Sequence, residues 1–430
     1  MKTQSVCRWR RRFVDGSIGR TRPPRQGASY NPGVSSTSTL RPGQRPETTA
    51  SVSSTAAPLG ERGGALLRHI HSEIAASGGW LGFERFMELA LYAPGLGYYS
   101  GGDRQFGLMP RADGSGGDFV TAPEMSPLFG RALARQVAQA LQATGTREVW
   151  EFGAGSGALA AQLLLTLDAL GCAPERYTIV DLSGSLRERQ ARTVAERAPT
   201  LAPRLRWVSE LPEALEGVVV GNEVLDAMPV ALIYWTGEVW QERGVALDAD
   251  GRLAWADRPT DLHPPVDSGF VPGTVTELPR IASGFIRTLA QRLRRGAAFF
   301  IDYGFPEHEY YHPQRTGGTL MCHRGHRADA EPLVDVGLKD LTAHVDFTAM
   351  ALAAQEAGLP VLGYTSQARF LFNCGLMADL ETADLRERAM ALKLVTEHEM
   401  GELFKVLALG APSCEFDPIG FAVGDRTHTL

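Results

Sequence analysis

A glycine-rich turn follows a short apolar run in the stretch VWEFGAGSGA, residues 149–158. Its glycines are Gly153, Gly155 and Gly157. Glycine lacks a Cβ atom, so it lets the backbone approach a ligand closely and adopt positive φ angles. A helix that begins right after the turn would direct its free N–H groups at the same ligand. The turn therefore predicts a site for a nucleotide-like cofactor, but its spacing fits more than one kind.

Two acids help to choose the cofactor. Glu151 lies in the apolar run before the turn, and Asp181 ends the next apolar run, 28 residues after Gly153. An acid in the second position can accept both hydroxyls of a ribose. An acid at 151 suits a cationic α-amino group and a sulfonium, and it is unfavourable beside a pyrophosphate. We expect S-adenosylmethionine, with a nicotinamide-dependent oxidoreductase as the alternative.

A second group of polar residues follows a run of valines in GNEVLDAMPV, residues 221–230. It contains Asn222, Glu223 and Asp226, and Asp302 ends a later apolar run. Carboxylates can hold a guanidinium by paired hydrogen bonds and orient its nitrogen, and they can take up the proton released on transfer. We predict that Glu223, Asp226 and Asp302 are catalytic, and that Asn222 binds the cofactor with Glu151, Asp181 and the three glycines.

The elements that must position these residues alternate along the chain. Apolar runs typical of strands are 148–155, 177–183, 204–210, 217–224 and 297–304. Stretches with helical spacing are 123–143, 156–170, 185–198 and 283–296. Alternating β and α units predict an α/β fold with a doubly wound, mostly parallel sheet. In such a sheet ligands bind beyond the carboxyl ends of the strands, where the glycine turn and the acids all fall.

Two segments depart from this alternation. Residues 230–256 carry turn signals at 236–237 and 248–251 between β-rich runs, which predicts a β-hairpin insertion. Residues 65–78 have helical spacing, with Leu66, Ile70 and Ile74 on one face, and we interpret them as part of an N-terminal helical lid.

The beginning of the chain has a different composition. Between residues 21 and 60, 23 of the 40 residues are Pro, Gly, Ser or Thr, too polar a mixture to bury a core. We expect residues 1–60 to be a disordered basic tail and residues 61–430 to form one domain. The tail resembles a mitochondrial transit peptide in composition. The alternative is a dispensable bacterial extension.

Charge, hydropathy and cysteine usage exclude several classes of protein. Residues 1–50 carry ten Lys and Arg against two Asp and Glu, whereas the remainder carries 33 against 47. An acidic body does not suit a nucleic-acid partner. No apolar run is long enough for a membrane helix, so we expect no membrane insertion. Five scattered cysteines favour a reducing compartment and indicate no metal site. We expect a bacterial cytoplasmic protein, or a protein of the mitochondrial matrix if the tail is a transit peptide.

Several stretches together resemble a known family, the MidA-like class I (Rossmann-like) S-adenosylmethionine-dependent methyltransferases. These are bacterial relatives of the mitochondrial complex I assembly-factor arginine methyltransferases. The matching stretches are LYAPGLGYYS (91–100), GDFVTAPEMSPLFG (117–130), EFGAGSGAL (151–159), GNEVLDAMPV (221–230), IDYGF (301–305) and DLTAHVDFTAM (340–350).

The resemblance implies methyl transfer to an arginine of a protein, and in the mitochondrial members that protein is a complex I subunit. It also implies that the loop with Asp118 and Glu124 lies near the cofactor, so Asp118 joins the predicted cofactor-binding residues. Two alternatives to this function stay open. The chain could be a non-catalytic assembly factor that binds a partner protein, or a methyltransferase for small molecules.

Overall fold

The computed structural model describes residues 60–101, 120–181, 183–267, 269–412 and 414–430. Asp118 and nearly all of the expected tail over residues 1–60 lie outside these ranges. None of the helices in the described ranges is both long and apolar enough to cross a membrane.

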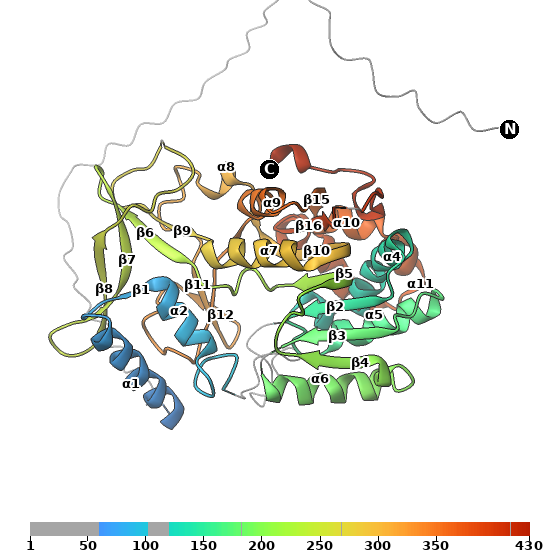
Figure 1. Cartoon of the computed structure of the whole chain (residues 1–430), viewed down its shortest axis with the longest axis horizontal. Coiled ribbons are helices and arrows are strands. Elements are labelled where there is room, and N and C mark those ends of the chain that lie inside the picture. The colour runs from blue at the N-terminus through green and yellow to red at the C-terminus, as the bar shows by residue number, and fades with distance from the viewer. Residues whose placement is uncertain (1–59, 102–119, 182, 268, 413) are drawn as a thin grey trace, which may run out of the picture. The chain divides into compact units, whose positions relative to one another are not determined.

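The main sheet runs in the order β15-β16-β10-β5-β2-β3-β4 (Figure 1). Its strands are β2 (Glu148–Phe152), β3 (Arg176–Val180), β4 (Leu205–Val208), β5 (Leu215–Asn222), β10 (Leu293–Phe305), β15 (Val361–Ser366) and β16 (Phe404–Gly410). The neighbours from β10 to β4 are parallel, and β16 pairs antiparallel with both β10 and β15. The short β14 (Val345–Asp346) pairs parallel with the end of β10. The expected strands and the mostly parallel pairing are confirmed.

Helices α4 (Pro127–Thr144), α5 (Ala158–Ala169), α6 (Gly184–Arg197), α7 (Arg280–Arg292) and α9 (Phe347–Glu356) accompany the main sheet. Helix α4 precedes its first strand, and the other four lie between its strands along the chain. Helix α5 packs beside α4 and α6, whereas α7 packs beside α9. The three valines of β5, Val218 to Val220, are all fully buried, so this central strand is covered on both faces. Each buried valine stabilises the fold by about 1.5–3 kcal/mol relative to an exposed one.

The single helix predicted over residues 123–143 is wrong in one respect. It is two helices, α3 (Ala122–Met125) and α4, separated at Ser126, whose backbone is extended (φ −151°). The Ser126 side chain accepts a hydrogen bond from the backbone N–H of Leu128, and Pro127 begins the new helix. Both are start signals for a helix, and they outweigh the continuous helical spacing.

The segment after β5 leaves the main sheet and forms an antiparallel one. Its strands are β6 (Ala231–Trp235), β7 (Trp240–Leu247), β8 (Leu253–Pro259) and β9 (Val275–Leu278), joined by β1 (Leu81–Gly82). The expected hairpins and both of their turns are confirmed. The sheet continues to Leu278, because β9 pairs with β6.

Two helices from the N-terminal part of the domain pack against this antiparallel sheet (Figure 1). They are α1 (Glu61–Ala76) and α2 (Phe83–Tyr92). The predicted apolar face of α1 is confirmed, since Leu66, Ile70 and Ile74 are buried. A third small sheet follows in the order β12-β11-β13, and its strands are β11 (Met321–Arg324), β12 (Arg327–Asp329) and β13 (Asp340–Thr342).

The remaining helices lie in the C-terminal third of the chain. They are α8 (Glu307–Tyr310), α10 (Gln367–Asn373), α11 (Leu376–Thr382) and α12 (Leu385–Val395). Helices α10, α11 and α12 pack against α4. They support the main sheet and contribute nothing to the lining of the cavity described next.

Candidate functional site

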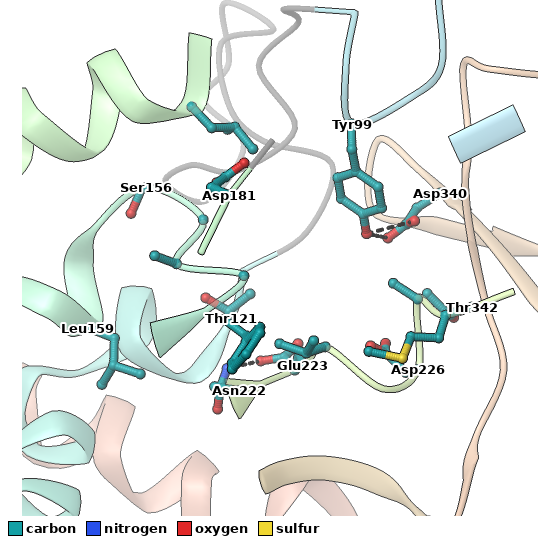
Figure 2. A pocket seen from close by; sticks show the side chains of 18 of the residues that line it. Tyr99, Thr121, Ser156, Leu159, Asp181, Asn222, Glu223, Asp226, Asp340 and Thr342 are labelled. Carbon is teal, nitrogen blue, oxygen red and sulfur yellow. Dashed lines mark hydrogen bonds between the residues drawn. The ribbon is translucent and has the colours of Figure 1, made fainter. Parts of the chain in front are cut away.

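A cavity of about 890 Å³ opens at the carboxyl ends of the central parallel strands. Its lining includes the last residues of β2, β3 and β5, which are Phe152, Val180 and Asn222, and also Asp181, which directly follows β3. Residues from α2, from the loop that follows it and from the three-stranded sheet complete the wall. This is the position at which a doubly wound sheet binds its ligand. Figure 2 shows Ser156 and Asp181 on one side, Tyr99 and Asp340 on the other, and Glu223 between them.

At one end, which we call the cofactor end, the glycine turn has the predicted backbone. Gly153, Gly155 and Gly157 have φ angles of 62°, 50° and 84°, all in the region that favours glycine. Gly153 and Gly155 line the cavity, whereas Gly157 does not. A Cβ atom on Gly157 would lie 2.9 Å from the Cα of Gln190, so this glycine lets α5 pack against α6.

Both acids of the cofactor end line the cavity and are held by protein donors. The Tyr177 hydroxyl donates to Oε2 of Glu151 at 2.6 Å. Asp181 accepts the backbone N–H of Ser183 and the side-chain amide of Gln190, each at 2.8 Å. Burial raises the pKa of Glu151 to about 7, against the lowering effect of the Tyr177 hydrogen bond.

The cofactor end fits an adenosyl ligand with a cationic amino-acid group. Asn222 lines the cavity, and its buried Oδ1 has no hydrogen-bond partner among the described residues. Its amide instead donates to Oε1 of Glu223 at 2.9 Å. The free oxygen of Asn222 and the carboxylate of Glu151 can both accept from an ammonium. Asp181 retains lone pairs for ribose hydroxyls, because a carboxylate can accept about four hydrogen bonds.

The opposite end, which we call the acceptor end, holds Glu223 and Asp226. Asp226 is 5% exposed, and its Oδ1 has no hydrogen-bond partner in the part of the chain that the structure describes. Burial, followed by repulsion from Asp226, raises the pKa of Glu223 to about 8. Burial raises the pKa of Asp226 to about 6, although a hydrogen bond with Tyr303 opposes the shift.

Asp302 does not line the cavity. It lies behind the loop that carries the other two acids and is 1% exposed. Its Oδ2 accepts the backbone N–H groups of Val224, Leu225 and Asp226, at 3.0, 2.9 and 3.3 Å. The geometry therefore does not place Asp302 against an acceptor group, where the sequence prediction put it.

Several residues of the acceptor end were not among the predicted site residues. The Tyr99 hydroxyl donates to both carboxylate oxygens of Asp340 at 2.9 Å, and the Tyr92 ring stacks on Tyr99 with ring centres 5.6 Å apart. His344 lines the same end, with its ring against Tyr303. Burial lowers the pKa of His344 to about 4, and nearby Arg315 adds to the effect, so the imidazole is neutral.

The sequence contained only a faint signal for these residues. Tyr99 and Asp340 lie within two of the stretches that resemble the family, but neither follows a strand of the main sheet. Glu124, which the resemblance placed near the cofactor, lines the cavity and accepts the Ser156 hydroxyl. Within the described ranges, no group of three or more His, Cys, Asp and Glu side chains could hold a metal ion.

Comparisons with known proteins agree with this geometry. Residues 132–365 match the family model described as "Putative S-adenosyl-L-methionine-dependent methyltransferase". A crystal structure of a protein from Burkholderia thailandensis bound to S-adenosyl-homocysteine is 53% identical. The match covers 86% of this chain and 97% of that one, with a TM-score of 0.82.

Two mitochondrial relatives are more distant in sequence. The protein arginine methyltransferase NDUFAF7 homolog of Caenorhabditis elegans is 24% identical, over 80% of this chain and 87% of its own. The protein arginine methyltransferase NDUFAF7 of Mus musculus is 28% identical, over 80% and 84%. The family match, the bound nucleoside of the bacterial structure and the cavity described above agree on the cofactor and on the class I fold. This chain belongs to the family of S-adenosylmethionine-dependent methyltransferases.

Proposed function

We propose that this methyltransferase modifies an arginine side chain of a protein. The observation that carries the proposal is the charge of the cavity wall. Among the described lining residues six are acidic and none is Lys or Arg. The six are Glu124, Glu151, Asp181, Glu223, Asp226 and Asp340. Such a wall favours cations. The cofactor has two positive groups, its amino group and its sulfonium, so the wall holds more acids than are needed to pair with them.

The surplus acids lie at the acceptor end, where their arrangement suits a guanidinium. A guanidinium is planar, presents five N–H donors and pairs with carboxylates through two parallel hydrogen bonds. Glu223, Asp226 and Asp340 supply the acceptors, and the free Oδ1 of Asp226 is one of them. The stacked rings of Tyr92 and Tyr99 add aromatic surface, against which guanidinium groups pack favourably.

The carboxylates have two tasks in the reaction. First, they hold the guanidinium so that one nitrogen faces the cofactor end of the cavity in line with the bond to be broken. The cofactor supplies the methyl group, so that the S–C bond breaks as the N–C bond forms and a neutral thioether leaves. Second, a carboxylate receives the N–H proton that the methylated nitrogen gives up. Glu223 suits this role because burial raises its pKa to about 8.

The names of the mitochondrial relatives support a protein as the acceptor. By the family resemblance we extend the proposal to a subunit of respiratory complex I. The proposed compartment is the bacterial cytoplasm, or the mitochondrial matrix if residues 1–60 are a transit peptide. We further propose that residues 61–430 are the catalytic unit.

Labelling with a methyl-tritiated cofactor tests the acceptor. The protein is incubated with an unfractionated bacterial lysate, and the labelled proteins and small molecules are identified by mass spectrometry. We expect label in methylated arginine. Label confined to small molecules would favour the small-molecule alternative and contradict the proposal. Cofactor binding without transfer to any acceptor would favour the non-catalytic assembly factor.

A further inference from the structure

Asp302 stands at the point where two neighbouring strands of the main sheet separate. Strands β5 and β10 pair in parallel up to Asn222 and Ile301, and the backbone N–H of Glu223 still donates to the Ile301 carbonyl at 2.8 Å. Beyond this point β5 leaves the sheet, whereas β10 continues to Phe305. Asp302 is the first residue of β10 past the last pair, beside the departing chain.

The departing chain turns sharply around the Asp302 carboxylate. Glu223 has a φ of 53°, an unusual backbone conformation for a residue other than glycine. The next three backbone N–H groups, those of residues 224–226, all point at Oδ2 of Asp302. The other oxygen, Oδ1, accepts the N–H of Tyr303 at 2.9 Å. Consecutive N–H groups after a left-handed residue form a concavity that binds anions, and here a carboxyl side chain of the protein itself occupies it.

The turn held in this way carries two acids of the acceptor end. Glu223 begins it and Asp226 ends it, and both line the cavity. Without this carboxyl in the concavity, the three N–H groups, two of them buried, would lose their acceptor, and the left-handed Glu223 would lose the contacts that compensate its strain. The directions in which Glu223 and Asp226 project therefore depend on Asp302.

We propose that Asp302 is a positioning residue for the methyl acceptor, which acts by clamping the turn of Glu223 and Asp226. It replaces the catalytic role predicted from the sequence, because its carboxylate is directed at the backbone and not into the cavity. This inference rests on the proposed function for its turnover measurement. Its second measurement, amide exchange, is independent of the acceptor.

The test compares Asp302→Ala and Asp302→Asn with the full-length wild-type protein. Active sites are counted by S-adenosylmethionine binding, so that turnover is expressed per bound cofactor and a loss of folded protein does not affect it. We expect turnover per site to fall about 100-fold in Asp302→Ala, the effect of misplacing reacting groups by about 1 Å. The Asn oxygen can still accept N–H groups, so Asp302→Asn should recover part of the loss. The cofactor dissociation constant should stay unchanged in both.

Hydrogen–deuterium exchange gives the second measurement. The amides of residues 224–226 should exchange faster in Asp302→Ala than in the wild type, whereas those of the central strand β2 should not change. Asp425→Asn is the matched control, because Asp425 also accepts backbone N–H groups, from Tyr364 at 3.0 Å and Thr427 at 3.3 Å, but does not line the cavity. Its turnover per site should equal that of the wild type.

Each outcome decides the proposal. Wild-type turnover per site in Asp302→Ala, or equal exchange at residues 224–226, would overturn it. A failure of Asp302→Ala to fold leaves the decision to Asp302→Asn, in which faster exchange at the turn is still required. If the wild-type protein methylates no arginine, the proposed function fails, but the exchange measurement still decides whether Asp302 clamps the turn.

Discussion

The two ends of the cavity hold their acids in different ways. At the cofactor end, Glu151 and Asp181 accept hydrogen bonds from Tyr177, Ser183 and Gln190. At the acceptor end, Asp226 keeps a buried oxygen without a partner in the described structure. Burial also raises the pKa of Glu223 further above its ordinary value than that of Glu151. The two acids of the cofactor end are thus held in place before a ligand binds, whereas Asp226 at the acceptor end bears an electrostatic cost that an incoming cation would relieve.

Among the proposed changes, Asp226→Asn at the acceptor end should have the largest effect on turnover. The amide keeps the size of the side chain but removes its charge, so the proposed guanidinium acceptor loses a charged partner and one route for its proton. We expect the turnover number to fall about 1,000-fold, within the range for removing an acid–base group. Cofactor affinity, measured by titration calorimetry, should not change. Equal turnover of the two proteins would remove Asp226 from the mechanism.

Gly155→Val should weaken cofactor binding at the cofactor end. A branched side chain at a φ of 50° is strained and would also occupy the turn that the cofactor approaches. We expect cofactor affinity to fall about 100-fold, equivalent to roughly 3 kcal/mol.

Gly251→Val is the matched control for that change. Gly251 has a φ of 75° in a hairpin turn, with no atom within 4 Å of an added Cβ. It carries a similar backbone strain but lies away from the cavity, so cofactor affinity should be preserved. A similar loss of affinity in both variants would show that backbone strain, and not the site, explains the result.

The pH dependence should differ between the two ends. A carboxyl with a raised pKa is neutral below that value, and the proposed arginine acceptor stays charged throughout, so acceptor binding should weaken as the pH falls. With the pKa of Glu223 at about 8 and that of Asp226 at about 6, kcat/KM for the acceptor should rise steeply between pH 6 and 8. The rise for one ionising group is about tenfold per pH unit.

Cofactor affinity should reach its plateau at lower pH, because burial raises the pKa of Glu151 only to about 7. Calorimetric titrations and initial rates over the same pH series compare the two ends directly. An acceptor profile that is flat from pH 6 to 8 would contradict the assignment of Glu223.

Two tyrosines give the smallest and most selective test. Tyr99→Phe removes the hydroxyl bound to Asp340, and Tyr177→Phe removes the hydroxyl bound to Glu151. Each change deletes one hydrogen bond to a carboxylate, which is equivalent to about a tenfold change in binding. We expect Tyr99→Phe to raise KM for the acceptor alone, and Tyr177→Phe to weaken the cofactor alone. If both variants affect both ligands equally, the division of the cavity into two ends is wrong.

The same division separates what the sequence could predict from what it could not. The cofactor end is built from short local patterns, a strand that runs into a turn, and Glu151, Gly153 and Gly155 could be identified from them. The acceptor end brings Tyr92 and Tyr99, from one stretch, together with Asp340, which is far away in the chain. No local periodicity reports that these segments meet, because their packing depends on tertiary contacts between the lid, the insertion and the small sheet.

Asp302 illustrates a different limit. Its residue type and its position at a strand end were both predictable, and they indicated a ligand-binding acid. The structure shows that Oδ2 already accepts the backbone of the neighbouring turn, and that Oδ1 accepts the N–H of Tyr303, the next residue of β10. Residue type and strand position do not reveal that the side chain points at the neighbouring turn where β5 has already left β10.

The absence of Lys and Arg from the described wall of the cavity has a consequence for selectivity in the cell. Nucleoside triphosphates and dinucleotides share the adenosine moiety, and they are abundant competitors for any adenosine pocket. A negative wall repels their phosphates over several ångströms. We therefore expect these metabolites to bind weakly to the described part of the cavity, and we expect effective inhibitors to carry positive charge.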